Sequence, residues 1–306
     1  MIKLGKQVEE TQSFKRYVGF APVKVLCVNP NKAQLAEIGI NVNDEPVYKT
    51  QIEVDGKKVN QTRVTIYVQT TDNDNKVDII SNVNFFCTNE VNVNRDKTKF
   101  QVIDNFGESS WVTKEQYQTK ALPPKTKMFG DYRPAKRGEV ELTKFIKYWA
   151  GIEDRTRWDN NAQTFVPVND AENCDIQLNW EDIMSGKLEE IKGLIVAAKE
   201  KETKENVVYK IKVLFGVQTT SEGRRYQTIF SRDFMRNNNN GYTNFYKKNI
   251  EDYKKSGGMA NVEYSAMIIH EYIPEKSVVT PNDSPIPDTI PETSSNDLSD
   301  LNDLPF

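Results

Sequence analysis

The stretch "RVTIYVQT" (residues 63–70) alternates polar and apolar side chains, and it sets the expectation for the fold. Val64, Ile66 and Val68 would share one face of an extended strand, and the residues between them would share the other. Such a period of two is typical of a half-buried strand in a sheet that faces a core on one side. The alternation therefore predicts a β-rich fold.

Similar strand patterns lie on both sides of this stretch. Residues 47–54 read as a strand that turns at Asp55 and Gly56, and residues 83–113 continue as a hairpin with further turns. We expect a meander of five or six antiparallel strands over residues 14–113. Such a set suits a closed or partly closed barrel, an OB-like fold among them, and it would suit a sandwich almost as well.

The second half of the chain mixes helices with strands. The segment 121–138 contains three prolines, two glycines and five basic residues, which indicates a loop or linker and a possible subdivision. The elements expected after it are helices at 139–151, 180–199 and 242–258 and strands at 207–217, 225–236 and 261–273. The predicted fold class is α+β and β-rich, an OB-like barrel elaborated with helices and additional strands. It would span residues 1–275.

Signatures of catalysis and of metal binding are largely absent from the sequence. The chain has one histidine, His270, and three widely spaced cysteines, Cys27, Cys87 and Cys174, which lack the paired spacing of a zinc site. It has no phosphate-binding glycine loop and no hydrolase or metalloprotease motif. The acidic run at 72–78 is better read as a polar turn than as a calcium loop. We expect no enzymatic activity, no metal and no cofactor.

No membrane or export signal is evident. No window approaches the roughly eighteen apolar residues that a membrane helix needs, and the first residues contain no apolar core of a signal peptide. The sequence predicts a cytoplasmic protein without a membrane partner.

Charge is distributed unevenly. Six of the 44 acidic residues and none of the 41 basic residues follow Lys276, so the net charge of −3 divides into +3 before that point and −6 after it. The segment 276–306 is also rich in Pro, Ser, Thr and Asn, which is typical of a disordered tail. A mildly basic body with an acidic tail is one arrangement found in nucleic-acid-binding proteins.

Aromatic and basic residues interleave at several places in the body. Single-stranded nucleic acid is held by cations that follow the phosphates and by aromatic faces on which bases stack, so these segments are candidate contact surfaces. Phe145 and Trp149 share a helical face with aliphatic residues and are expected in the core, as are Trp111 and Phe230 in strand patterns. The residues at which we expect nucleic-acid contact are Lys15, Arg16, Tyr17, Lys125, Lys127, Phe129, Tyr132, Arg133, Lys136, Arg137, Arg224, Arg225, Tyr226, Arg232 and Arg236.

The final residues, "DLSDLNDLPF" (297–306), resemble the acidic tip of bacterial single-stranded DNA-binding proteins. In that family the tip docks into basic-rimmed apolar pockets of replication and repair proteins, a form of terminal-carboxylate capture. The resemblance implies a partner-binding site for replication or recombination proteins, formed by Asp297, Asp300, Asp303, Leu304, Pro305 and Phe306.

The body is similar to single-stranded DNA-binding proteins of large tailed phages, crAss-like phages among them. The likeness rests on the segments "FKRYVGFAPVKVLCVNPNK", "QVIDNFGESSWVTKEQY" and "YRPAKRGEVELTKFIKYW". It implies non-catalytic, sequence-independent binding of single-stranded DNA. The zinc site of the T-even phage protein cannot be built from this sequence. A virion or scaffold protein with an addressing tail, and a mediator of strand annealing, are the alternatives.

Overall fold

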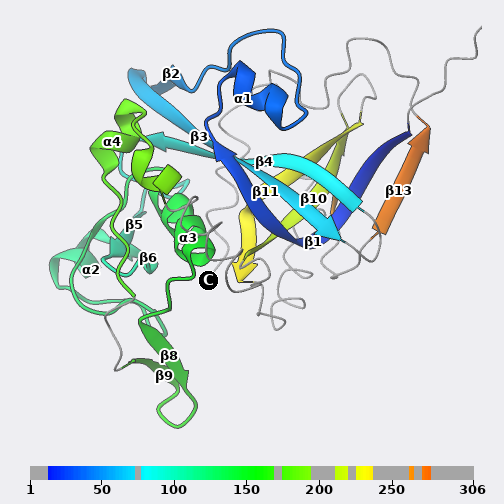
Figure 1. The fold of residues 1–306 in the computed structure, drawn as a ribbon. Helices are drawn as coiled ribbons and strands as arrows, with labels where there is room; N and C mark the ends of the chain where they lie inside the picture. Colours follow the sequence, from blue (N-terminus) through cyan, green and yellow to red (C-terminus); the bar gives the residue numbers. More distant parts are fainter. Residues whose placement is uncertain are drawn as a thin grey trace, which may run out of the picture.

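The computed structural model of the chain is β-rich, with antiparallel sheets and short to medium helices (Figure 1). The α+β, β-rich class predicted from the sequence is confirmed at that level. The structure describes residues 13–72, 77–168, 174–193, 211–219, 225–236, 262–264 and 271–276.

Five long strands form the centre of the main sheet. Their order is β11-β10-β1-β3-β4, and each neighbouring pair is antiparallel. The strands are β1 (Ser13–Val28), β3 (Lys57–Asp72), β4 (Val77–Thr88), β10 (Ile211–Thr219) and β11 (Arg225–Arg236).

The connections among these strands make a Greek key. β1, β3 and β4 pair in that order, with the short edge strand β2 (Lys49–Val54) between β1 and β3 in the sequence, and β10 returns after a long connection to lie beside β1. β11 extends the sheet beyond β10 and approaches β4. No hydrogen-bonded ladder joins β4 to β11 among the described residues, so this sheet is not closed.

β1 changes partners along its length, which explains why it is so long. Its first residues pair with β13 (Glu271–Lys276), its middle pairs with β10, and its last residues pair with β3 after a bulge between Val25 and Cys27. β2 (Lys49–Val54) adds to the edge of β3, and β12 (Val262–Tyr264) pairs with β10. The strand expected at 261–273 is thus two short strands. The helix expected at 242–258 lies outside the described residues.

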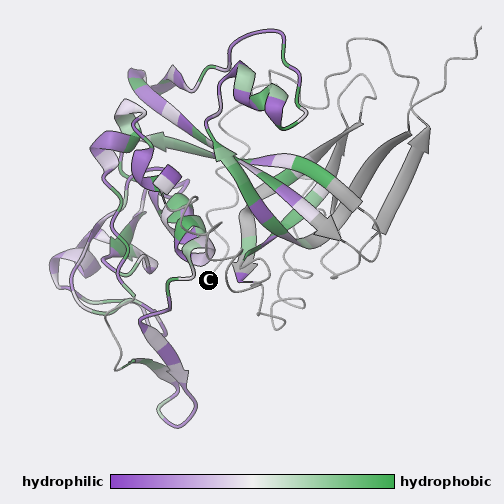
Figure 2. Ribbon diagram, in the orientation of Figure 1, coloured by the Kyte–Doolittle hydropathy of each residue, from purple (hydrophilic) through white to green (hydrophobic). Residues whose placement is uncertain are grey.

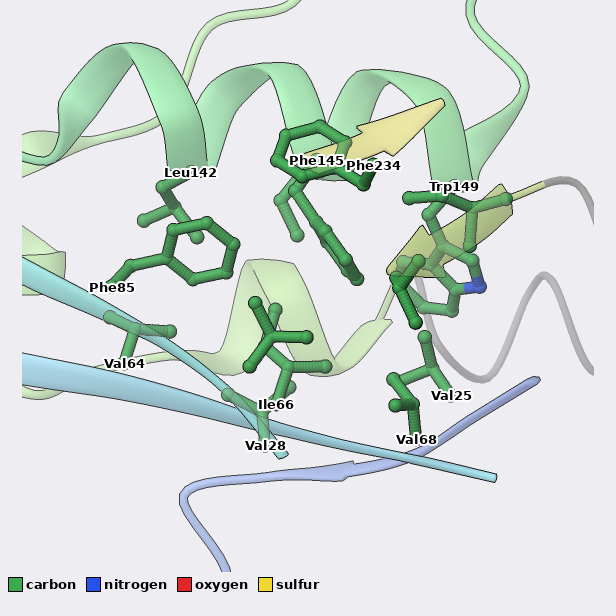
Figure 3. Packing of buried hydrophobic residues seen from close by; sticks show 14 of the residues in the cluster. Val25, Val28, Val64, Ile66, Val68, Phe85, Leu142, Phe145, Trp149 and Phe234 are labelled. Carbon is green, nitrogen blue, oxygen red and sulfur yellow. The ribbon is translucent and has the colours of Figure 1, made fainter. Parts of the chain in front are cut away.

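The main core lies between the sheet and helix α3 (Glu139–Ala150). Leu142, Phe145 and Trp149 of the helix pack against the apolar face of β3, where the alternation of residues 63–70 predicted a buried side (Figure 3). The Phe145 ring contacts those of Phe85 and Phe234 edge-on, at centroid distances of 5.5 and 5.3 Å. In Figure 2, green apolar residues alternate with hydrophilic ones along the coloured parts of the strands of this sheet and recur along α3. The core position predicted for Phe145 and Trp149 is confirmed.

Gly138 allows α3 to start directly against β4. Its φ of 81° lies in the left-handed region, and a Cβ added there would come within 2.4 Å of the Phe86 carbonyl oxygen. Only glycine meets both conditions without strain.

Between β4 and β10 the chain builds a smaller unit beside the main sheet. It contains the sheet β6-β5-β7 and the β8–β9 hairpin, so the expected meander is interrupted after β4. Met128, Val102, Val112 and Tyr132 form its small core. Its strands are β5 (Lys99–Asp104), β6 (Ser109–Thr113), β7 (Tyr132–Pro134), β8 (Thr156–Asp159) and β9 (Thr164–Pro167).

Three short helices complete the described structure. α1 (Lys32–Glu37) and α2 (Lys114–Gln118) each begin with a capping box, at Asn31 and Thr113 respectively. α4 (Trp180–Ser185) ends at Gly186 with a left-handed residue, which is the break expected within residues 180–199.

Candidate nucleic-acid interface

The first expected contact group, Lys15, Arg16 and Tyr17, lies in the first half of β1. The backbone of this segment pairs with β13, and Arg16 stands opposite Ile273. The side chains of these residues lie outside the described part, so their contact with DNA stays a prediction.

The loop 121–138 places its expected residues in different environments. Lys125 and Phe129 are exposed, and Phe129 retains 46% of its accessible surface. Lys127 reaches the β8–β9 hairpin, where its ammonium lies 5.5 Å from the centre of the Phe165 ring. Of these three residues, only Lys127 is placed directly against the β8–β9 hairpin.

Arg133 and Lys136 face helix α3. Arg133 donates two hydrogen bonds to the buried carboxylate of Glu139, at 2.5 and 3.0 Å, and the Lys136 backbone N–H donates to the same group. The Lys136 ammonium lies 5.9 Å from the ring centre of Trp180. The Arg137 backbone N–H donates to the Glu90 carbonyl. The Arg133 side chain and the Lys136 backbone thus fasten the loop to the start of α3 through Glu139.

Tyr132 is placed differently from the expectation. Its side chain is buried in the small core, and its ring packs edge-on against Tyr117 at 5.8 Å. A base could stack on this ring only by opening that core, because both faces are enclosed by the packing. We leave Tyr132 out of the proposed contact surface.

The expected contact residues on or next to β11 also differ in how much of them the structure describes. Arg224 lies outside the described residues, and only the backbone is described for Arg225, Tyr226 and Arg232. Arg236 bonds to Asp154 at 2.9 Å and to the Ile152 carbonyl at 2.6 Å, and its guanidinium stacks 4.4 Å from the Tyr148 ring. Because the Arg236 guanidinium binds groups within the protein, we leave this residue out of the proposed contact surface as well.

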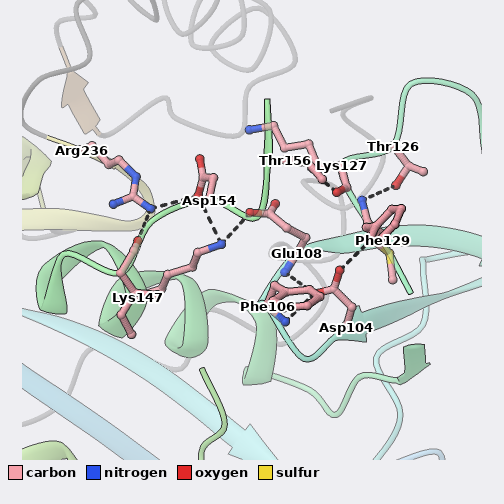
Figure 4. A network of polar contacts seen from close by, with 12 residues as sticks. Asp104, Phe106, Glu108, Thr126, Lys127, Phe129, Lys147, Asp154, Thr156 and Arg236 are labelled. Carbon is pink, nitrogen blue, oxygen red and sulfur yellow. Dashed lines mark hydrogen bonds and ion pairs between the residues drawn. The ribbon is translucent and has the colours of Figure 1, made fainter. Parts of the chain in front are cut away.

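A polar network lies beneath the loop 121–138 (Figure 4). The buried Asp104 carboxylate accepts backbone N–H bonds from Phe106 and Glu108, both at 2.9 Å, and from Phe129 at 3.2 Å. Burial raises its pKa to about 6, although these bonds favour the charged form. One carboxylate thus joins the β5–β6 turn to the loop that carries Phe129.

The outer face of β3 and β4 carries a set of residues that the sequence analysis did not select. Arg63 and Phe86 stand opposite each other on that face, and Phe86 keeps 39% of its surface exposed. The Arg63 guanidinium lies 5.6 Å from the Tyr48 ring and donates to the Val47 carbonyl. We call Tyr48, Arg63 and Phe86 the sheet-face cluster.

The strand surface around Arg63 and Phe86 is polar but not acidic, whereas the carboxylate of Glu45 lies near Tyr48. Between residues 63 and 69 of β3, and between 80 and 86 of β4, the outward positions carry no Asp or Glu. Thr65 donates to the Asn84 side chain at 2.7 Å, and Asn84 donates to Asn82 at 2.8 Å. The far end of this face is covered by α1 through Leu35 and Tyr67. The alternation in residues 63–70 predicted which side chains face outward, but not that Phe86 would join them.

Neither a metal cluster nor a membrane helix is found in the described part of the chain. No group of three or more His, Cys, Asp or Glu side chains is suited to hold a metal ion there. No described helix is long and apolar enough to cross a membrane. Cys87 and Cys174 are buried, Cys27 is half-buried, and none of these three cysteines forms a disulfide bond.

Comparisons with models of known protein families, with curated proteins and with solved structures find no match. The functional argument therefore rests on the geometry of these surfaces and on the resemblances noted in the sequence.

Proposed function

We propose that this protein binds single-stranded DNA without sequence preference and without catalysis, through an OB-like barrel. An OB fold is a five-stranded, partly open Greek-key barrel that binds oligonucleotides on the face of its second and third strands. The order β11-β10-β1-β3-β4, with β11 approaching β4, supports this assignment. β3 and β4 then correspond to the second and third strands.

The observation that carries the proposal is the position of the sheet-face cluster. Phe86 and Arg63 lie on the outer face of these two strands, and Tyr48 lies in the connection between β1 and β3. This is where an OB fold places its binding surface. An exposed aromatic ring offers a stacking face to any base, and a nearby guanidinium offers a phosphate contact. The lack of carboxylates at the outward positions favours a polyanion.

Residues 277–306 would act separately from this surface. We propose that the terminal residues Asp297, Asp300, Asp303, Leu304, Pro305 and Phe306 recruit replication or recombination proteins, as the resemblance to the bacterial tip implies. These residues lie outside the described part of the structure. Their charge would also compete with DNA for cationic surfaces of the body, an effect that salt would screen.

Substitution of Phe86 tests the proposed surface. Phe86→Ala should weaken binding of a fluorescent oligo-dT about tenfold, because one stacked base contributes about 1–3 kcal/mol. Phe86→Tyr should bind as the unchanged protein does. Val93→Ala serves as the matched control, because Val93 is also exposed (41%) but bridges to Phe100 in the smaller unit. Equal affinities for Phe86→Ala and the unchanged protein would remove the sheet face from the proposal.

A further inference from the structure

We infer that the smaller unit carries a second site for unpaired bases, on the β8–β9 hairpin and the adjoining loop. This inference rests on the proposed single-stranded DNA binding and adds a surface outside the barrel. We call the site the hairpin patch. Its residues are Lys127, Phe129, Arg155, Trp158 and Phe165.

One half of the hairpin patch is formed by the hairpin itself. Trp158 and Phe165 stand opposite each other across β8 and β9, with ring centroids 5.1 Å apart in an edge-on contact. Trp158 remains 37% exposed. The ammonium of Lys127 lies over the Phe165 ring at 5.5 Å. An exposed indole beside a second ring and a cation is a typical platform for a stacked base with its phosphate.

The other half is formed around Phe129. Its ring is exposed, and the Arg155 guanidinium lies between it and Phe106, at 6.0 and 5.6 Å from the two ring centres. The guanidinium is also bonded to the Val168 carbonyl, which holds it in place. One face of Phe129 is thus backed by a cation while much of the ring remains open to solvent.

A direct bond joins the two halves. The Thr156 hydroxyl donates to the Lys127 carbonyl at 3.1 Å, so the hairpin is tied to the loop. Thr156 and Trp158 are two residues apart on β8 and share the face turned toward that loop. Lys127 lies two residues before Phe129, so this bond links the strand that carries Trp158 to the loop that carries Phe129.

The polar network of Figure 4 fixes the backbone under the patch. Asp104 holds the backbone of Phe106 and Phe129 together, while Asp154, the neighbour of Arg155, is bound by Lys147 and Arg236 at 3.2 and 2.9 Å. A surface held in this way loses little conformational entropy when a ligand binds. The network therefore holds the hairpin patch in one arrangement before a ligand binds.

Charge favours a nucleic acid over a protein as the occupant. Lys125, Lys127, Arg155 and Arg157 lie in or beside the patch. Of the neighbouring carboxylates, Asp154 and Asp159 already have partners within the protein, whereas Asp131 and Glu153 are exposed. Asp154 faces Lys147 and Arg236, and Asp159 accepts two backbone N–H bonds of its own turn. Aromatic faces beside these cationic side chains match the bases and phosphates of a single strand.

The test uses the double variant Phe129→Leu and Trp158→Leu in the full chain. Leucine keeps apolar cover over Phe165 and the loop, so the fold should survive, and a thermal melt followed by circular dichroism checks this. Affinity for oligo-dT of about 30 nucleotides, longer than the roughly 16 nucleotides that one OB fold covers, should fall at least about tenfold. The pair Phe129→Tyr and Trp158→Phe should restore it, because both keep an aromatic face.

Tryptophan fluorescence gives a second readout. Trp158 is exposed while Trp149 and Trp180 are buried and Trp111 is half-buried, so stacking at the patch should quench mainly Trp158. Trp158→Phe should bind oligo-dT normally but lose most of the quenching.

Three outcomes separate the inference from the proposed function. If the double variant loses affinity and the aromatic pair restores it, the hairpin patch binds bases. If the folded double variant binds as the unchanged protein does, while Phe86→Ala is weakened, the barrel binds DNA and the inference is overturned. If the unchanged protein binds no oligo-dT, the proposed function fails and the inference fails with it.

Discussion

At Asp104 a single buried carboxylate accepts three backbone N–H groups from two separate segments. Its pKa of about 6 means that burial opposes the charged form more than these bonds favour it. At Asp104, therefore, the hydrogen bonds that fix the local backbone come at a cost in folding stability. Such positions are expected where a surface must be held in one arrangement.

Asp104→Asn should change how stability depends on pH. The folded pKa of about 6 is raised above the unfolded value of about 3.9, so this group's contribution is complete below pH ~4 and is lost as pH rises through ~6. The loss amounts to about 3 kcal/mol at neutral pH. Asparagine cannot ionise. Between pH 4 and pH 7.5, the unfolding free energy of the variant should therefore rise by about that much relative to that of the unchanged protein.

Urea unfolding of both proteins at the two pH values measures this difference, since the titration of all other groups cancels in the comparison. A difference in unfolding free energy that does not vary with pH would show that Asp104 is not desolvated as described.

Single residues also mark the limit of what the sequence alone could predict. Phe129 and Tyr132 lie three positions apart in the same cationic loop, and the sequence gives no reason to separate them. In the fold, Phe129 is exposed and Tyr132 is buried against Tyr117, which lies on another element. Local composition predicts a binding segment, but long-range packing decides which rings are available.

At the scale of elements, helix α3 connects the two parts of the structure. Its apolar side packs on the main sheet, while its fully buried Lys147 binds Glu108 at 2.7 Å and Asp154 at 3.2 Å. Although burial works to raise it, the pKa of Asp154 is lowered, because Lys147 and Arg236 both lie close to its carboxylate. The helix thus fixes the β5–β6 turn and the start of the β8–β9 hairpin at the same time.

Lys147→Met should destabilise the protein by about 3 kcal/mol. Removing one partner of a buried pair leaves the other charge without compensation; here Glu108 loses its ion-pair partner, and Asp154 loses one of two. Chemical unfolding measures the loss. Lys144→Met, on the same helix but half-buried, is the matched control and should cost less than about 1 kcal/mol. Similar losses for both variants would mean that the network contributes little.

The elements that could be predicted were those whose pattern is local. The alternation in residues 63–70 predicted the buried face of β3, and the apolar spacing that includes Phe145 and Trp149 predicted α3. The division of β1 among three partner strands could not be predicted, because pairing depends on segments more than a hundred residues away. The break between β4 and β5 was missed for the same reason, since both are strands with similar patterning.

At the scale of the whole molecule, a Greek-key sheet carries a smaller unit inserted between β4 and β10. The main sheet supplies the sheet-face cluster, and the insertion supplies the hairpin patch. The chain continues into 277–306, which holds six negative charges and no positive ones. We expect these three parts to act on one DNA strand and one partner protein.

Phe306→Ala and removal of residues 277–306 test the role proposed for the tail. Removal should leave the affinity for oligo-dT unchanged or higher, because six carboxylates no longer compete for the cationic surfaces. Phe306→Ala should abolish docking of a replication or repair protein while DNA affinity stays nearly the same. Pull-down with such a partner and a parallel binding titration measure the two effects. Loss of DNA binding on removal would contradict this division of roles.

A salt titration of oligo-dT binding, compared with a duplex of equal length, tests the central proposal most directly. Fluorescence anisotropy at about 50 mM salt should show tight binding of the single strand and much weaker binding of the duplex. The logarithm of the affinity should fall linearly with the logarithm of salt concentration, because bound phosphates release counterions. No binding of the single strand at about 50 mM salt, or equal binding of strand and duplex, would contradict the proposal.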